Sequence, residues 1–376
     1  MAVSNNPNVV NNGLVFEYDM SNTQKSWIGR PSTNTCNYNT YNYTDGNATV
    51  TRGATPPIAP PISGYEISKM QSNNGADTSM NILYTSNVDQ VNGGVYTHSA
   101  WVLLTAGTYC RIGQHWNPWD AGPAQYIPLN KWTRVSYTLT NYGSNYGSIA
   151  NAYGTDGTIY ITAVQYEAGS TPTLFMGGAG ASRSNTQALL DLTNNNTITA
   201  SSLTYASDST FNFNGSNNYI AIPNKTLGNG NVAWTVSAWV KTTSSNNGTG
   251  INSILSNSSG GPVCSAMCVN NGKITYWTYH DGWYQSLGTK TINDGAWHLL
   301  TWVNYTNYTM DMYVDGIIDV NVANSTSGNN NPVDRIGGSW AGYFPGSISN
   351  LSIYNRALSA AEVKQNFNAT RSRYGI

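Results

Sequence analysis

Short runs of alternating hydrophobic and polar residues recur along the chain, and helical periodicity is nearly absent. Val, Ile, Tyr, Trp and Thr fill these runs, while Gly, Asn, Pro and Ser separate them. Many short strands with frequent turn signals are typical of a β-sandwich or a barrel. The pattern predicts strands at FEYDM (16–20), THSAWVLL (97–104), RVSYTLT (134–140), TIYITAVQYE (158–167), WTVSAWVKT (234–242), KITYWTY (273–279), HLLTWVNY (298–305), MDMYVDG (310–316) and SISNLSIYN (347–355).

One helix is predicted, close to the end of the chain. In LSAAEVKQNF, Ser359 is a good N-cap residue and Glu362 stands three positions later, as in a capping box. Leu358 and Val363 flank the cap as a hydrophobic staple. We therefore expect a short helix over 359–368, followed by a tail, RSRYGI.

Two segments have the composition of joints between domains. The first is GRPSTNTCN (29–37), where Pro31 interrupts the pattern, and the second is FMGGAGASRS (175–184). The tetrapeptide SNTQ occurs at 21–24 and again at 184–187. Two explanations stay open: chance in a chain rich in Asn, Ser and Thr, or a chain that leaves one domain near the first copy and re-enters it near the second.

Composition limits the classes of partner. Charged residues make up only 9% of the 376 positions, and the net charge is −1 with no basic run. Nucleic-acid binding needs clustered Lys and Arg, so nucleic acid is not an expected partner. No apolar run approaches the roughly 20 residues of a membrane helix, and the start of the chain has no features of a secretory signal.

The four cysteines do not suggest a metal or disulfide framework. Cys36, Cys110, Cys264 and Cys268 form no CxxC pair, and the four histidines are scattered, so zinc is not supported. We expect buried, small apolar side chains. Cys264 and Cys268 would share one face of a strand, but four positions apart they are too distant to form a disulfide.

From Phe211 onward the order of motifs resembles the concanavalin A-like lectin/glucanase (laminin-G-like) jelly rolls. The motifs are FNFNGSNNYIAIP (211–223), AWTVSAWVKT (233–242), NDGAWHLLTWVNYTNYTMDMYVDGI (293–317) and FPGSISNLSIYNRALSAAEV (344–363). Asp315-Gly316 suits a type I′ hairpin turn, and Gly346 precedes the closing strand where a backbone kink needs no side chain.

The resemblance implies that this jelly roll is interrupted. Members usually open with a strand such as GLVFEYD, here at 13–19, followed closely by a segment such as DLTNNNTIT, here at 191–199. We therefore predict an all-β chain of two β-sandwich (jelly-roll) domains with one short C-terminal helix. Residues 1–30 and 182–376 form the discontinuous jelly roll, and 31–181 form a second sandwich inserted into it.

The inserted segment resembles a carbohydrate-binding-module jelly roll. The similarity lies in VYTHSAWVLLTAGTYCRIG (95–113), LNKWTRVSYTLT (129–140) and TIYITAVQYEAGSTPTLFM (158–176). The last of these is similar to a phrase common in phage structural proteins, I-x-x-x-Q-x-E-x-G-x-x-x-T-x-F. The whole arrangement resembles virion proteins of tailed phages.

Hydrolysis of glycans needs two positioned carboxylates. Glucanases of the superfamily carry them as E-x-D-x-E on one strand, a motif that this chain lacks. Glu17 and Asp19 share a strand face, but such a pair at a strand end is more often structural. Glu362 is expected to serve the helix cap. A hydrolase is therefore the third-ranked interpretation.

Sugar binding is the chemistry that the aromatic clusters favour, because sugars stack on exposed rings. YWTYHDGWYQS (276–286), HWNPWD (115–120) and SWAGYF (339–344) are the clusters. We expect Trp239 and Trp302, and with less preference Trp277, to face the core or another subunit. The candidate carbohydrate-binding residues are Trp283, Tyr284, Asp281, His280, Tyr279, Trp116 and Trp119.

No cofactor is required; calcium is an option at Asp19, Asp281 or Asp334 by residue type alone.

These features favour a non-enzymatic surface protein of a phage particle, in a capsid decoration, a fibre or an appendage, with contacts to host glycans. Its expected partners are other virion proteins, copies of itself and host surface polysaccharide. It would be made in the host cytoplasm without a signal peptide and placed on the particle exterior. The alternative is a secreted or cell-surface bacterial lectin or adhesin, which should carry an export signal. In the phage protein, the aromatic hairpin at 276–286 would be either a sugar platform or a contact between subunits.

Overall fold

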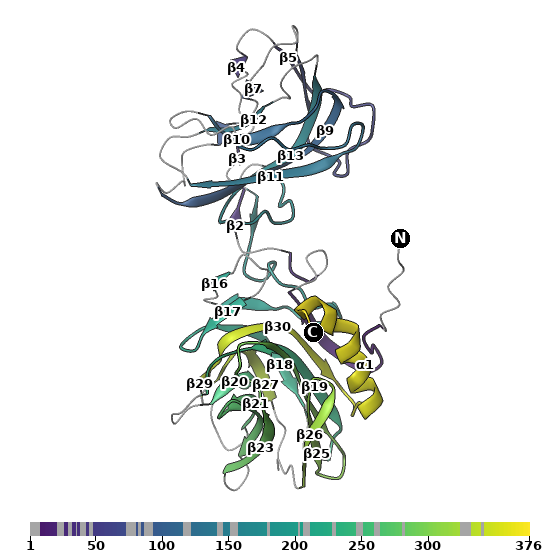
Figure 1. Cartoon of the computed structure of the whole chain (residues 1–376), viewed down its shortest axis with the longest axis vertical. Coiled ribbons are helices and arrows are strands. Elements are labelled where there is room, and N and C mark those ends of the chain that lie inside the picture. The colour runs from purple at the N-terminus through teal and green to yellow at the C-terminus, as the bar shows by residue number, and fades with distance from the viewer. Residues whose placement is uncertain are drawn as a thin grey trace. The chain divides into compact units, whose positions relative to one another are not determined.

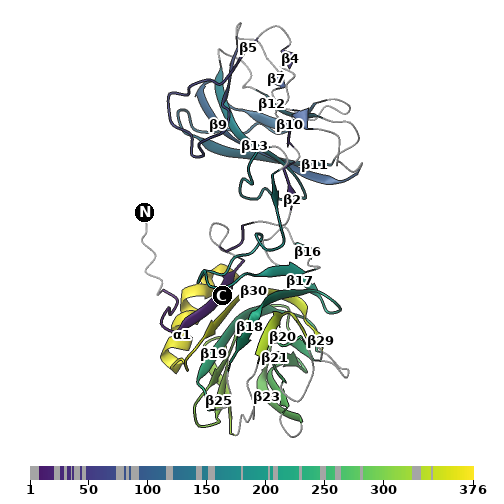
Figure 2. The ribbon, with the colours of Figure 1, turned by 180° about the vertical axis from the view of Figure 1, so that it is seen from behind.

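The protein is all-β with a single short helical region in the part of the chain described, and it divides into two compact units (Figures 1 and 2). One unit contains Met1–Arg30 and Asn185–Ile376, and the other contains Pro31–Ser184. The computed structural model describes residues 8–20, 26–28, 32–34, 36–37, 43–44, 48–72, 80–81, 84–85, 93–115, 122–140, 146–150, 157–178, 181–201, 204–205, 211–227, 231–245, 251–258, 264–279, 283–323, 332–339 and 342–376.

The discontinuous unit is a sandwich of two large antiparallel sheets. The first sheet has the order β16 (Thr204–Tyr205), β17 (Phe211–Asn214), β30 (Pro345–Tyr354), β19 (Trp234–Lys241), β24 (Trp297–Asn304), β25 (Met310–Val314) and β26 (Ile317–Val322), with β1 (Leu14–Asp19) also paired to β30. The second has the order β15 (Thr199–Ser201), β18 (Tyr219–Thr226), β27 (Pro332–Ile336), β20 (Asn252–Ser256), β21 (Cys264–Asn270), β22 (Lys273–Tyr279) and β23 (Trp283–Thr291). The small hairpin of β28 (Gly338–Ser339) and β29 (Gly342–Tyr343) follows β27.

One apolar core fills the space between these sheets. Val236 and Leu300 of the first sheet meet Ile254, Met267 and Tyr276 of the second in a single buried cluster. Strand alternation explains which residues enter it, because Val236, Ala238 and Val240 point inward while Ser237 and Trp239 point to the other face. Trp302 lies in this core as predicted, and its Nε1 donates to the carbonyl of Thr275 at 3.1 Å.

The first strand completes the C-terminal sheet. In β1, Phe16 pairs with Ile353 and Asp19 pairs with Asn350 of β30. Asp191 fixes the strand from its other side, because its Oδ1 accepts a hydrogen bond of 3.0 Å from the backbone N–H of Glu17. The strand at 13–19 and the segment at 191–199 therefore lie together, as the interrupted jelly roll requires, although the domain boundaries themselves stay a prediction.

The two ends of the interruption are also adjacent within this unit. Trp27 and Leu189 form an antiparallel bridge, and the N–H of Ile28 donates to the carbonyl of Ala188 at 3.0 Å. The segment that follows the first SNTQ copy thus pairs with the segment that follows the second. The first copy itself, at 21–24, falls outside the described residues.

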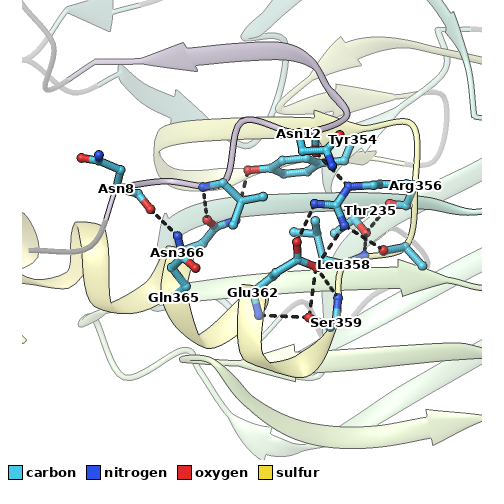
Figure 3. A network of polar contacts seen from close by, with 12 residues as sticks. Asn8, Asn12, Thr235, Tyr354, Arg356, Leu358, Ser359, Glu362, Gln365 and Asn366 are labelled. Carbon is cyan, nitrogen blue, oxygen red and sulfur yellow. Dashed lines mark hydrogen bonds and ion pairs between the residues drawn. The ribbon is translucent and has the colours of Figure 1, made fainter.

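The predicted helix is present as α1 (Ala360–Thr370), with Ser359 as its N-cap. The capping box is complete, since Glu362 N–H donates to Ser359 Oγ at 3.3 Å and Ser359 N–H donates to Glu362 Oε2 at 2.9 Å (Figure 3). Arg356 adds an ion pair to Glu362 at 2.6 Å and lowers the pKa of that carboxyl to about 2, together with the Ser359 N–H. Leu358 and Val363 share one buried cluster, as expected of a staple.

The N-terminal segment is fastened to the same helix. Asn366 Oδ1 accepts a hydrogen bond of 2.8 Å from the N–H of Val10, and Gln365 Nε2 donates to the carbonyl of Asn8 at 2.7 Å (Figure 3). Arg356 Nε donates to the carbonyl of Asn12 at 2.9 Å. The first and last described parts of the chain therefore stabilise each other.

The last residues do not form the simple tail that the sequence suggested. Arg371–Tyr374 form a 3₁₀ helix, η2, that continues directly from α1. The ring of Tyr374 stacks on Trp239 with centroids 4.1 Å apart, and Arg373 pairs with Asp19 at 2.6 Å. This contact with the outer face of the sheet explains why Trp239 is buried there, beneath the C-terminal residues, and not between the sheets.

The inserted unit is a second, smaller sandwich. Its main sheet has the order β11 (Thr133–Thr140), β9 (Val95–Ala106), β13 (Thr158–Ala168), β6 (Ser68–Ser72) and β5 (Ala48–Arg52). Among the described residues of this unit, four two-stranded sheets accompany it: β10 (Arg111–His115) with β12 (Tyr146–Ala150), β3 (Cys36–Asn37) with β8 (Tyr84–Thr85), β4 (Tyr43–Thr44) with β7 (Met80–Asn81), and β2 (Ser32–Thr33) with β14 (Ser182–Arg183). Residues from β9, β10, β11 and β13 share one buried cluster, and the Pro-rich segment 54–64 runs near Trp132, whose Nε1 donates to the carbonyl of Ile58 at 2.9 Å.

A buried polar network closes this unit near its chain ends. There, β2 (Ser32–Thr33) pairs with β14 (Ser182–Arg183). Glu167 accepts hydrogen bonds from Gln165 Nε2 at 2.7 Å and from the N–H of Thr173 at 2.8 Å, and Arg183 donates to Thr173 Oγ1 at 2.9 Å. The phrase Q-x-E-x-G-x-x-x-T therefore has a structural role: it folds residues 169–176 back onto the end of β13.

Two other sequence predictions concern cysteines and membranes. Cys110 and Cys268 are buried and free, as expected, whereas the side chains of Cys36 and Cys264 lie outside the described part of the structure. Among the described residues, no helix is both long and apolar enough to cross a membrane.

Candidate aromatic binding site

The hairpin of β22 and β23 carries the aromatic cluster singled out from the sequence, at the edge of the seven-stranded sheet. Its register pairs Tyr279 with Trp283, Thr278 with Tyr284 and Trp277 with Gln285. Tyr276 enters the core, so its neighbour Trp277 faces the other side of the sheet. The fold therefore divides the five aromatic residues of this hairpin between the core and the outer surface.

The outer side of the sheet presents a partly exposed Trp on an apolar base. Trp277 packs against Ile251, Ala266 and Cys268, and it is itself only partly buried. Gln285 stands next to it on the edge strand and is exposed. A partly accessible ring that rests on buried apolar side chains is an arrangement in which aromatic residues stack on sugars.

Tyr284 is the one predicted carbohydrate-binding residue whose side chain the structure describes. Its side chain is 45% exposed, and Leu287 on the same strand is 38% exposed. Trp283 and Tyr279 are placed as backbone partners only, and His280 and Asp281 at the hairpin tip lie outside the described residues. Trp116 and Trp119 also lie outside them, directly after β10.

The only pair of carboxylates that the sequence offered for hydrolysis has structural partners. Asp19 is buried and ion-paired with Arg373 at 2.6 Å. Glu17 accepts a hydrogen bond from Asn350 Nδ2 at 3.3 Å, and burial raises its pKa above the ordinary value despite that bond. Both side chains lie on the face of the sheet to which the C-terminal residues contribute Arg373 and Tyr374.

A second cluster of charged residues surrounds the predicted Asp-Gly turn. Asp315 and Gly316 both have positive φ, of 56° and 74°, as a type I′ turn requires. His298 Nδ1 lies 2.9 Å from Asp315 Oδ2, and its Nε2 lies 3.2 Å from Asp294 Oδ1. Lys290 also reaches Asp315 Oδ2, at 2.7 Å.

These contacts tie the strands of the two sheets together and set the charge of the cluster. The hydrogen bond to Asp315 is the main reason that the pKa of His298 is raised above its ordinary value, although burial opposes the shift. Burial also opposes ionisation of Asp315, but His298 and Lys290 outweigh it and lower the pKa of that carboxyl. The motif at 293–317 contains both His298 and Asp315, in NDGAWH and YVDG, but their contact was not predicted from the sequence.

The two calcium candidates that the structure describes have protein partners. Asp19 is held by Arg373, and Asp334 Oδ2 accepts a hydrogen bond of 2.6 Å from Ser258 Oγ. Asp281 is outside the described residues. Within the part of the chain that the structure describes, no three His, Cys, Asp or Glu side chains converge as metal ligands would.

Residues 214–364 match the family model of the concanavalin A-like lectin/glucanases superfamily, so the resemblance deduced from the motifs of this segment is confirmed. No curated protein matches the chain.

Several solved structures are similar to part of the chain at low identity. The receptor-binding domain of botulinum neurotoxin D is 14% identical with a TM-score of 0.40, over 50% of this chain and 51% of that one. The binding domain of Paraclostridial Mosquitocidal Protein 1 is 17% identical with a TM-score of 0.37, over 47% and 48%. Domain 4 of AbnA, an extracellular GH43 arabinanase from Geobacillus stearothermophilus solved with arabinotriose, is 22% identical with a TM-score of 0.37, over 47% of this chain and 91% of that one. The chain thus spans about half the length of the first two structures.

Proposed function

We propose that this protein is a non-catalytic surface protein of a tailed-phage particle and that it contacts glycans of the host. It would sit on the particle exterior, in a capsid decoration, a fibre or an appendage, and associate there with other virion proteins and with copies of itself. The function has two parts, glycan contact and particle assembly, and different observations support each part.

The hairpin of β22 and β23 carries the glycan part of the proposal. Trp277 presents a partly accessible ring on the outer face of β22. Tyr284 on the edge strand is nearly half exposed, and because it pairs with Thr278 it lies on the opposite face of the hairpin. This hairpin lies inside the segment that matches the lectin/glucanase superfamily. Rigid, amphipathic rings on a sandwich surface suit the apolar faces of sugar rings.

The engagement of the candidate carboxylates supports a non-catalytic role. A retaining or inverting glycosidase needs one carboxyl group as acid and a second as nucleophile or base, both facing the substrate. Asp19 is neutralised by Arg373, and Glu362 is committed to the helix cap and Arg356. A carboxylate held in an ion pair inside a sheet–helix contact is a poor nucleophile.

The assembly part rests on the sequence resemblance to phage structural proteins. A chain with 26 Tyr and only 9% charged residues has a surface suited to wide contacts between protein copies, because Tyr is enriched in interface cores and charged residues are depleted there. The alternative is a secreted or cell-surface bacterial lectin, which would use the same hairpin without a particle.

Mass spectrometry and gold-labelled antibodies on purified phage particles test the assembly part. We expect the chain among the particle proteins and the label on intact particles, at their surface. A chain found only in the culture medium or on bacterial cells, with unlabelled particles, would favour the free lectin.

The variants Trp283→Ala and Tyr284→Ala test what the hairpin contacts. If it stacks on sugar, loss of one ring weakens binding to host surface polysaccharide by about 1–3 kcal/mol, the scale of an interface hot spot. If it packs on a neighbouring subunit, incorporation into particles falls instead and polysaccharide binding is unchanged. Tyr308→Ala is a matched control, since Tyr308 is 42% exposed in the turn between β24 and β25.

A further inference from the structure

The inserted unit exposes a pair of tyrosines that no sequence motif pointed to. Cys110 and Gln125 form a bridge in which each N–H donates to the other's carbonyl, at 3.0 and 2.8 Å. In an antiparallel ladder, the residue before one partner lies opposite the residue after the other. Tyr109 and Tyr126 are therefore cross-strand neighbours, and their ring centroids lie 5.5 Å apart at an interplanar angle of 60°.

Both rings belong to the outer side of this ladder. Cys110 is fully buried and joins the core of the unit together with Ile112, so the alternating residues Tyr109 and Arg111 face away from that core. Tyr126 is 73% exposed, the largest exposed fraction among the exposed large hydrophobic side chains of the described residues. The guanidinium carbon of Arg111 lies 5.6 Å from the centroid of the Tyr109 ring. The three side chains thus form one row: Tyr126, Tyr109 and Arg111.

The row is held on a rigid base. Besides the bridge, Gln125 Nε2 donates to the carbonyl of Ser136 on β11 at 2.9 Å. Gly122 has a φ of +67°, and a Cβ there would lie 2.1 Å from the carbonyl oxygen of Ile112, so the returning segment runs in close contact with β10. A preorganised surface of this kind loses little conformational entropy when it binds a ligand.

The size and chemistry of the row identify the occupant. Because the two rings meet edge to face, the largely exposed ring of Tyr126 offers one apolar face of the size of a single sugar unit, flanked by the Tyr109 ring, a guanidinium and two phenol groups that can hydrogen-bond to hydroxyls. A second copy of the chain or another protein would need about 800 Å² on this side, far more than two rings supply.

We propose that Tyr126, Tyr109 and Arg111 form a glycan-binding platform in the inserted unit, on which a pyranose of a polysaccharide stacks. This platform is separate from the β22–β23 hairpin. The inference rests on the proposed function, because both surfaces would contact host glycans. The chain then has two glycan contacts, one in each unit, and gains avidity on a polymeric ligand.

Affinity electrophoresis of the full chain tests the platform. The gels contain extracted host surface polysaccharide or, separately, soluble mannan, xylan, β-glucan or alginate. We expect at least one polymer to retard the wild-type protein, and Tyr126→Ala to weaken that binding roughly tenfold, the loss of one stacked ring at a hot spot. Tyr126→Trp keeps a ring and should retain binding. Leu129→Ala is the matched control, because Leu129 is 52% exposed in the same segment and has no ring.

Each other outcome overturns the proposal in a recognisable way. If Tyr126→Ala binds like the wild type while Tyr284→Ala binds weakly, the platform is wrong and the proposed glycan function stands. If no polymer, including host polysaccharide, retards the wild type, both are wrong. If Tyr126→Ala instead changes the mass measured by light scattering, the row is a contact between copies. Unchanged far-UV circular dichroism shows that the variants are folded.

Discussion

At the scale of single residues, two buried histidines respond to pH in opposite directions. His98 lies in the inserted unit against the ring of Tyr166, at 3.9 Å between centroids, and burial lowers its pKa to about 3. His298 lies in the other unit between Asp315 and Asp294, and the bond to Asp315 raises its pKa. Because the pKa shifts of the two histidines have opposite signs, we expect different pH dependences of stability for the two units.

The expected stability profile follows from which state binds the proton. Below pH about 6.5 the unfolded chain protonates His98 while the folded state does not, so the unfolding free energy falls by up to about 1.4 kcal/mol per pH unit as the pH drops. For His298 the folded state keeps the proton longer. Its contribution is complete below about 6.5 and is lost as the pH rises through the raised pKa.

Urea unfolding between pH 5 and pH 9 measures both effects. The variant His98→Gln should remove the acid-side loss, and His298→Gln should remove the alkaline-side loss, each leaving the other limb as in the wild type. A wild type and a His298→Gln variant with parallel profiles above pH 6.5 would contradict the assignment.

At the scale of elements, the C-terminal 3₁₀ helix η2 serves as a clamp on the sheet. Arg373 pairs with Asp19 of β1, and Tyr374 stacks on Trp239 of β19 and donates to Ser349 Oγ at 3.1 Å. The clamp thus joins the first strand, a central strand and the last strand of the same sheet.

Removing the guanidinium of Arg373 should destabilise the discontinuous unit. The carboxylate of Asp19 would stay buried without its partner, which costs up to 3–5 kcal/mol for fully buried pairs. Because the Arg373 side chain is 46% exposed, we expect about 1–3 kcal/mol. Chemical denaturation of Arg373→Ala, Asp19→Asn and the double variant forms a cycle. The double variant should recover part of the loss, and strictly additive effects would refute the pairing.

The sequence predicted strands well where alternation is strong, and less well where distant contacts decide. The runs at 234–242 and 298–305 became β19 and β24 with similar bounds, since both faces are apolar or covered. The clamp was missed because RSRYGI has no helix signal of its own, and distant residues, namely Trp239, Asp19 and Ser349, make its position favourable. The same limit applies to the site: Trp239 and Trp277 are alike in sequence, and only the elements packed over them distinguish a buried ring from an accessible one.

At the scale of the whole molecule, the two ends of the chain form one sandwich, and the segment between them forms a second. The pairing of β1 with β30 spans nearly the full sequence, so no local pattern could supply it. The resemblance to an interrupted jelly roll predicted only that 13–19 belongs to the C-terminal jelly roll beside 191–199, and not that it pairs with β30. What the sequence could not supply is the geometry of the joint, where Ile28 and Ala188 meet through a backbone hydrogen bond of 3.0 Å.

We predict that the inserted segment can be removed at this joint. Because Ile28 and Ala188 are already in contact, a linker of a few Gly and Ser residues in place of 31–184 should close the gap with little strain. We expect a soluble protein that unfolds cooperatively and whose Trp emission is that of buried rings, as in the full chain. As a control, the same deletion combined with removal of 8–19 lacks β1 and the contacts of Val10 and Asn8 with α1, and it should be far less stable. An insoluble linker variant, or one no better folded than this control, would mean that the two units do not fold independently.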